Sequence, residues 1–215
     1  MVGMAITTSS IAVAARCVWV EAGVGSVATQ NVTDPRLGRL GLEMLSQGLD
    51  AEAVVDAMVE GGDFPDHRQF ACVDMNGRSA AFSGEKVLGI HGHRTGPNVA
   101  VAGNLLSSTD VLDAMYEAFL VDPDAHLADR LLGALGAGKT AGGEVSQNER
   151  SAGLEVWHQH TFPLVDLRID WDEEDPVAAL AGLWGRYRPE MDAYVTRALD
   201  PMSAPPFHAE NALDG

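Results

Sequence analysis

The sequence predicts an α+β fold in which helices pack on mainly antiparallel sheets. Segments rich in β-branched and small residues alternate with segments whose apolar residues recur at helical spacing. The helices come in pairs and the strands in groups, and the dipeptide Asn76-Gly77 is a strong hairpin signal between two of the strands. A parallel βαβ fold would alternate single strands with single helices, so this order favours the α+β class.

The expected helices begin at residues that suit helix starts. Asp34 and Asp50 each precede a helical pattern, where an aspartate side chain accepts a hydrogen bond from an unpaired backbone N–H. Asp175-Pro176 also predicts a helix start, because proline fits the first turn of a helix. The expected elements are two buried strands within 3–30, helices over 35–47 and 51–60, strands at 69–74, 79–83, 87–91 and 99–103, helices containing 111–119 and 127–135, strands at 151–157 and 165–169, and helices from 176 and over 189–199.

Composition and charge exclude several classes of protein. Of the 215 residues, 46% are apolar, which is enough for a packed core. A formal charge of −17 repels phosphate backbones, so we expect no nucleic acid partner. The apolar stretches fall far short of the roughly 20 residues that a membrane span needs, so we expect no membrane partner either.

The chain is expected to form one domain over residues 1–200, followed by a C-terminal extension over 201–215. Two cysteines are too few for a disulfide framework and predict a reducing compartment, the cytoplasm. Cys17 and Cys72 lie in apolar, strand-like segments, so we expect inert buried thiols.

Residues 133–140 match the phosphate-loop pattern G-x-x-x-x-G-K-T. That loop needs a strand before it and a helix after it, so that backbone N–H groups meet the phosphates. Here helical leucine spacing precedes the match and no apolar face follows it. The pattern therefore predicts glycines just past a helix end, with Lys139 complementing the negative end of the helix dipole.

Neither a metal nor a cofactor is predicted. The pairs His91/His93 and His158/His160 each suit one face of a strand, but neither has a companion ligand at a spacing that completes a site. The acidic run over 170–175 lacks the glycine turn and closing glutamate of a calcium loop. It is better explained as a helix start, where negative charge is favoured.

Hydroxyl and amide side chains are the main candidates for chemistry. Thr8 lies in the first expected strand, and Thr29 and Gln30 close the second. A hydroxyl nucleophile needs a base, and spacing alone identifies none. Asn104 follows a strand, where its amide either donates to an oxyanion or shapes the turn.

Five segments resemble a known family, domain-of-unknown-function family 1028. They are GVGSVATQNVTDPRLGRLGLEMLSQGLDAEAVV, DHRQFACVDMNGRSAAFSG, GHRTGPNVAVAGNLLSS, LADRLLGALGAGKTAGGE and VDLRIDWDEEDPVAAL, in the family's order. The resemblance runs from Gly3 to about Tyr187. It implies an N-terminal-nucleophile (Ntn) hydrolase-like fold, which is a four-layer α/β/β/α sandwich with mainly antiparallel sheets.

The sequence departs from this family pattern in several places. An Ntn hydrolase uses the α-amino group of a leading Thr, Ser or Cys as its base, whereas this sequence has Val2 after Met1. Family members usually begin with an additional strand ahead of the segment that matches Gly3. The sequence also differs at residues 148–152 and at Asp172, where a histidine is common.

The resemblance leaves two functions open. In the first, the protein is an Ntn-type amidohydrolase of small amide or peptide-like substrates of the cell-wall type. Thr8 and Thr29 would act as nucleophile or positioning groups, and Asn104 as the oxyanion donor. Arg68 and Arg94 would hold a substrate carboxylate through their planar guanidinium groups.

Gln30 is also expected among the substrate-binding residues of such a hydrolase. In the second function, the protein is a non-catalytic binding or assembly module of the same fold and forms a homo-oligomer, a dimer. Val2 at the position of a nucleophile and the lack of a recognisable base favour this alternative.

Overall fold

The computed structural model of the chain describes residues 1–145 and 148–205. Its elements are β1 (Val2–Thr8), α1 (Ala14–Cys17), β2 (Val18–Glu21), β3 (Gly25–Asn31), α2 (Pro35–Ser46), α3 (Ala51–Gly61), η1 (Pro65–His67), β4 (Arg68–Asp74), β5 (Ser79–Ser83), β6 (Ile90–Gly96), β7 (Val99–Leu106), α4 (Asp110–Leu120), α5 (Leu127–Thr140), β8 (Ser151–Trp157), β9 (Val165–Ile169), α6 (Pro176–Tyr187), η2 (Arg188–Glu190) and α7 (Met191–Leu199). The expected C-terminal extension lies largely outside the described residues.

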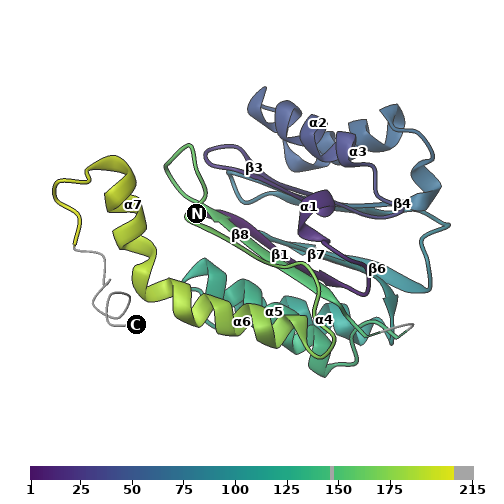
Figure 1. Cartoon of the computed structure of the whole chain (residues 1–215). Coiled ribbons are helices and arrows are strands. Elements are labelled where there is room, and N and C mark those ends of the chain that lie inside the picture. Colours follow the sequence, from purple (N-terminus) through teal and green to yellow (C-terminus); the bar gives the residue numbers. More distant parts are fainter. Residues whose placement is uncertain (146–147, 206–215) are drawn as a thin grey trace.

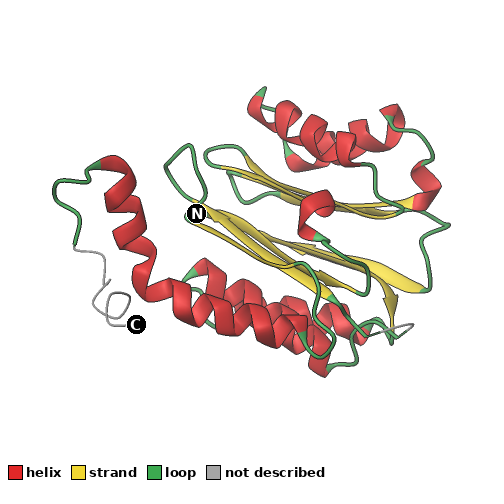
Figure 2. Ribbon diagram, in the orientation of Figure 1, coloured by secondary structure: helices red, strands yellow, loops and turns green. Residues whose placement is uncertain are grey.

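The strands lie in two facing groups. One group is the antiparallel sheet β2-β3-β4-β5, and the other contains the antiparallel sets β1-β8-β9 and β6-β7. Helices α2 and α3 cover the outer side of the first group, and α4, α5 and α6 cover the outer side of the second (Figure 1). Figure 2 shows the same arrangement by element type, with the strands between α2 and α3 on one side and α4, α5 and α6 on the other. The α+β class with antiparallel sheets is thereby confirmed.

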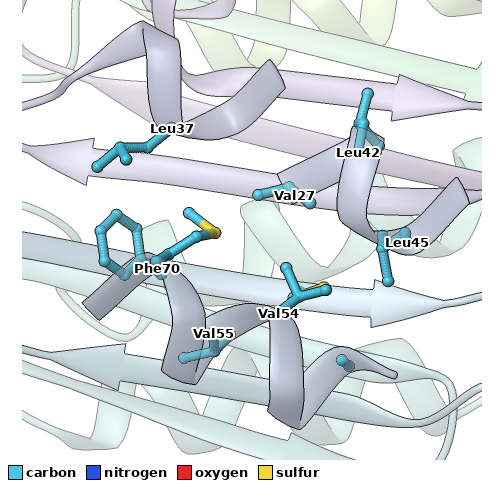
Figure 3. Close-up of a cluster of buried hydrophobic side chains, with 10 residues drawn as sticks. Val27, Leu37, Leu42, Leu45, Val54, Val55 and Phe70 are labelled. Atoms are coloured by element: carbon cyan, nitrogen blue, oxygen red, sulfur yellow. The ribbon is translucent and has the colours of Figure 1, made fainter. Parts of the chain in front are cut away.

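Helices α2 and α3 begin where the sequence predicts and pack on the outer face of β3 and β4. The Asp34 carboxylate accepts a hydrogen bond from the backbone N–H of Arg36, and the Asp50 carboxylate accepts one from Ala53, each at 3.0 Å. The apolar faces of both helices form one core with the strands below them. Figure 3 shows this core, which includes Val27, Leu37, Leu42, Leu45, Val54, Val55 and Phe70.

A second core lies between the helices α5 and α6 and the set β1-β8-β9. Leu154 and Val156 of β8 and Leu180 of α6 are completely or almost completely buried in it. Asp175 caps α6 by accepting a hydrogen bond from Ala178 N–H at 3.0 Å. Its other carboxylate oxygen lies 2.6 Å from Lys139 Nζ, which ties the start of α6 to the end of α5.

Three boundaries differ from the prediction. Residues 3–30 contain three strands and the short helix α1, which has four residues and is too short to show helical periodicity. The strand expected at 87–91 lies at Ile90–Gly96, because Gly89 adopts a left-handed turn with φ of +63°. Residues 133–140 lie inside α5 rather than after it, so the helix end was predicted too early. A phosphate loop precedes its helix, so the structure also excludes that loop.

The two cysteines are buried and form no disulfide. Burial raises the pKa of the Cys17 thiol. Burial, with added repulsion from Asp74 and Asp50, raises the pKa of Cys72 to about 12. Both thiols are therefore protonated and unreactive near neutral pH, as the sequence predicts. Among the described residues, no helix has the length and apolar character that crossing a membrane requires.

The second core offers a direct test of the packing. Leu180 is 0% exposed, so we expect Leu180→Ala to lower the free energy of unfolding by about 3 kcal/mol through the cavity it leaves. Leu199→Ala is the control, because Leu199 on α7 is 58% exposed and its loss should change stability by less than about 0.5 kcal/mol. Urea unfolding of both variants measures the difference, and equal losses would contradict this assignment of the core.

Candidate functional site

A cavity of about 590 Å³ lies between β1 and β7. Helices α4 and α5 bound it on one side, and strands β3 and β4 bound it on the other. Most of its walls are apolar, with Val111, Met115 and Leu131 on the helix side and Ala28 and Ala71 on the strand side. Its size is typical of a site for a small organic ligand or a short peptide.

One end of this cavity is polar. The polar and charged residues that line the cavity there come from five separate parts of the chain: Thr8, Gln30, Asn104, Lys139, Glu144 and Glu149. We call this set the polar end. Apolar walls with a few convergent polar groups are the usual composition of a binding or catalytic site.

Glu144 is the centre of the polar end. Its carboxylate accepts hydrogen bonds from the Ser9 backbone N–H at 2.9 Å, from Ser9 Oγ at 2.7 Å and from Thr8 Oγ1 at 3.4 Å. The Glu144 backbone forms a β-bridge with Leu106 at the end of β7. A carboxylate that accepts a hydrogen bond from a hydroxyl has the arrangement a general base needs.

Glu149 contacts the backbone of Glu144. The Glu149 side chain is buried, and its Oε1 accepts a hydrogen bond from the Glu144 backbone N–H at 3.3 Å. Gly143 makes this contact possible, because a Cβ there would lie 2.5 Å from that same oxygen. Gly143 also adopts a φ of +51°, which favours glycine. The Glu149 carboxylate therefore lies against the backbone of Gly143 and Glu144.

A buried amide network holds Gln30 in the cavity wall. Gln30 Nε2 donates to Gln69 Oε1 at 2.7 Å, and Gln69 is completely buried. Gln69 Nε2 in turn donates to Ser83 Oγ at 2.9 Å and to the Gly103 carbonyl at 3.0 Å. The network thus connects β3, β4 and β5 to β7, one residue before Asn104.

The network ends at His93, whose Nδ1 lies 3.0 Å from Ser83 Oγ. Burial, with a smaller contribution from Arg94, lowers the pKa of His93 below its usual value. The imidazole is therefore neutral near pH 7, and its partner is a serine. Among the described residues, no three His, Cys, Asp or Glu side chains gather as metal ligands.

The structure brings Thr8, Gln30 and Asn104 together at the polar end, and it places the other predicted site residues elsewhere. Thr29 points to the opposite face of β3, beside Phe70 under α2 and α3, where it is completely buried.

The two arginines predicted to bind substrate have other partners. Arg68 is buried and donates to the backbone carbonyls of Asp63 and Val32. Arg94 forms a two-pronged ion pair with Asp113, at 2.5 and 2.9 Å. The cation in the cavity wall at the polar end is instead Lys139, which pairs with Asp175.

Sequence reasoning missed Glu144 and Gln69. Glu144 lies 135 residues from Ser9 in the sequence, and its own segment shows no strand or helix pattern. Gln69 could have been found from the sequence. A glutamine next to Phe70 and Ala71 in an apolar strand is expected to be buried and therefore to need a hydrogen-bond partner.

Comparison with known proteins gives a family. DUF1028, a family of unknown function, matches residues 1–180. The chain belongs to the DUF1028 family. A crystal structure of the DUF1028 protein SPO2555 from Silicibacter pomeroyi is similar, with 32% sequence identity and a TM-score of 0.79 over 86% of this chain and 82% of that chain. No curated protein matches. The description of the DUF1028 family names no reaction.

Glu155 is a further carboxyl group with an altered pKa in this DUF1028 chain. It lies on β8 and pairs with Met4 of β1, and Met4 lines the cavity. Burial raises the pKa of Glu155 to about 7, although the Trp157 indole N–H donates to its carboxylate and lowers the pKa in part. Asp166 nearby adds to the rise.

This pKa predicts a pH dependence of stability. Between pH 4.5 and about 7 the folded chain holds a proton that the unfolded chain releases, so the free energy of unfolding falls as pH rises. In Glu155→Gln we expect this fall in the free energy of unfolding to be smaller by about 1 to 2 kcal/mol, a value that allows for the partial exposure of Glu155. Urea unfolding at pH 5 and pH 8 measures it, with the exposed Glu117→Gln as control. An unchanged fall in Glu155→Gln would show that Glu155 titrates normally.

Proposed function

We propose that the chain has the four-layer α/β/β/α arrangement of Ntn hydrolase-like folds and hydrolyses small amide or peptide-like substrates at the polar end of the cavity. The two facing groups of strands with helices outside them support the fold. The observation that carries the activity is the hydrogen bond of Thr8 Oγ1 with the Glu144 carboxylate, 3.4 Å long, in the wall of the cavity.

Thr8 is the nucleophile in this proposal and Glu144 is its base. Thr8 Oγ1 attacks the amide carbon while Glu144 takes the hydroxyl proton, and Glu144 then gives that proton to the leaving amine. Water hydrolyses the resulting ester in the same way, with Glu144 again as base. Ser9 forms a shorter hydrogen bond to Glu144, but Thr8 is the one that lines the cavity. The two hydrogen bonds from Ser9 therefore orient the base.

Asn104 and Gln30 have separate roles. The Asn104 side-chain amide stabilises the oxyanion that forms on the substrate carbonyl, because Asn104 on β7 lines the same end of the cavity as Thr8 on β1. Gln69 fixes Gln30 by accepting a hydrogen bond from its Nε2. The hydrogen-bonding groups of the Gln30 amide that Gln69 does not use bind the substrate. Thr29, Arg68 and Arg94 have no part in this mechanism, since their side chains have partners or positions away from the cavity.

The test is turnover of a panel of amides and dipeptides by wild type and variants. We expect Thr8→Val and Glu144→Gln each to lower kcat/KM by at least about 100-fold, because each removes a partner of the proton transfer. Thr7→Val is the matched control, since Thr7 donates to the Ser151 carbonyl and not to Glu144.

Full activity in Thr8→Val would exclude Thr8 as the nucleophile. If Ser9→Ala alone abolished turnover, the nucleophile would be Ser9. Lack of turnover by wild type across the whole panel would favour the alternative, a non-catalytic binding or assembly module of the same fold.

A further inference from the structure

One buried side chain, Gln69 of β4, connects the sheet β2-β3-β4-β5 to the set β6-β7. Its Nε2 donates to the Gly92 carbonyl of β6 at 3.1 Å and to the Gly103 carbonyl of β7 at 3.0 Å. Gly92 and Gly103 are partners in the β6-β7 ladder, which is irregular between Ile90 and Gly92. Because Gln69 is 0% exposed, its amide depends on partners within the protein.

The two carbonyl groups determine which end of the Gln69 amide points toward them. A backbone carbonyl oxygen accepts hydrogen bonds and never donates them, so an amide nitrogen beside two carbonyls satisfies both, whereas an amide oxygen in that place would be repelled. The Gln69 nitrogen therefore faces Gly92 and Gly103. The Gln69 oxygen must then point away from them, toward Gln30.

The orientation of Gln69 decides the orientation of Gln30. One end of the Gln30 amide lies 2.7 Å from Gln69 Oε1, and only its nitrogen can donate a hydrogen bond there. Gln69 thus holds the Gln30 nitrogen, and the Gln30 oxygen is turned away from Gln69. Gln30 lines the cavity, and within the described part of the chain its Oε1 accepts no hydrogen bond. An acceptor is therefore free at the polar end.

Ser83 and His93 complete the network without setting this orientation. Ser83 Oγ accepts a hydrogen bond from Gln69 Nε2 at 2.9 Å and lies 3.0 Å from His93 Nδ1. Ser83 is one acceptor among three for the Gln69 nitrogen, and it is the only side chain of the three. Without its hydroxyl, the two backbone carbonyls would still hold the Gln69 amide in the same orientation.

We propose that Gln69 is a positioning residue that holds the Gln30 amide with its oxygen toward the substrate, and that Gln30 Oε1 accepts a hydrogen bond from an N–H group of that substrate. The proposal rests on the hydrolysis proposed above for the place of the substrate, but it concerns recognition and not bond cleavage. It narrows the substrate class to compounds that carry an amide N–H, such as peptides and N-acylated amino acid amides. Tertiary amides lack this donor.

The expected selectivity follows from the cost of an unpaired acceptor. A ligand without the donor would take water away from Gln30 Oε1 and supply no hydrogen bond in its place, which costs free energy. A site that hydrogen-bonds an N–H group therefore rejects the analogue that lacks it. A methyl group on the ligand nitrogen removes the donor and also prevents approach to hydrogen-bond distance.

The orientation of Gln30 is tested by NMR in the wild-type chain with ¹⁵N-labelled glutamine. The variant Gln30→Met identifies the Gln30 NH₂ protons by their loss. We expect one of them to exchange with water at least about tenfold more slowly than a free glutamine amide, because it is bonded to Gln69. Ser83→Ala should keep this protection, and Gln69→Leu should abolish it.

Each result of the exchange measurement decides the matter. Free exchange of both Gln30 protons in wild type would overturn the proposal, whether or not Gln69→Leu folds. Protection that survives in Gln69→Leu would also overturn it, because another acceptor would then hold Gln30. Loss of protection in Ser83→Ala would show that the serine, and not the two backbone carbonyls, sets the orientation of the network, contrary to the argument above.

The donor is tested with two ligands, N-acetylalanine methylamide and the same compound with both nitrogens methylated. Binding is measured in Thr8→Val, which lacks the proposed nucleophile, from the shifts of the Ala28 and Gly103 backbone amide signals, since both residues line the cavity. We expect the N–H ligand to bind at least about tenfold more tightly. Adding Gln30→Met should reduce this ratio to less than about threefold, and adding Gln47→Met, at an exposed glutamine, should leave it unchanged.

Equal affinities of the two ligands, or binding of neither, would overturn the proposal. A ratio that Gln30→Met leaves unchanged would overturn it too, because the acceptor would then be another residue. The proposed hydrolysis fails separately from this proposal. A wild type that turns over none of the amide panel, combined with retained discrimination between the two ligands, would contradict the mechanism at Thr8 and still support recognition by Gln30.

Discussion

The hydrogen bonds of Glu144 are the constraint on which the site depends. In the described residues no ladder joins β1 to β7, so their relative position depends on the helices beneath them and on the segment that crosses between their ends. Glu144 connects the two strand ends, because its backbone forms a bridge with Leu106 of β7 and its carboxylate accepts a hydrogen bond from Ser9, which follows β1. Because the same carboxylate contacts Thr8, the side chain that fixes the relative position of the two strands is also the base in the proposed mechanism. A change at Glu144 therefore alters geometry and chemistry together.

Local signals predicted most of the fold. The caps at Asp34, Asp50 and Asp175 act between residues two or three positions apart, and the Asn76-Gly77 turn acts within four. These interactions depend on sequence neighbours alone, so the sequence is sufficient to predict them. Strand counting within residues 3–30 failed because α1 is a single turn whose residues are as apolar as the strands beside it. Packing rather than periodicity decides its conformation.

The site was predictable only in part, because its members meet through long-range contacts. Thr8, Gln30 and Asn104 lie near strand ends, where polar residues in an apolar strand stand out. Their common cavity depends on the layering of β1, β3 and β7, which spacing does not reveal. Thr29 was chosen by residue type, but strand alternation turns it away from Gln30 to the opposite face. The register between β3 and β4, which pairs Gln30 with Gln69, is needed to distinguish the two.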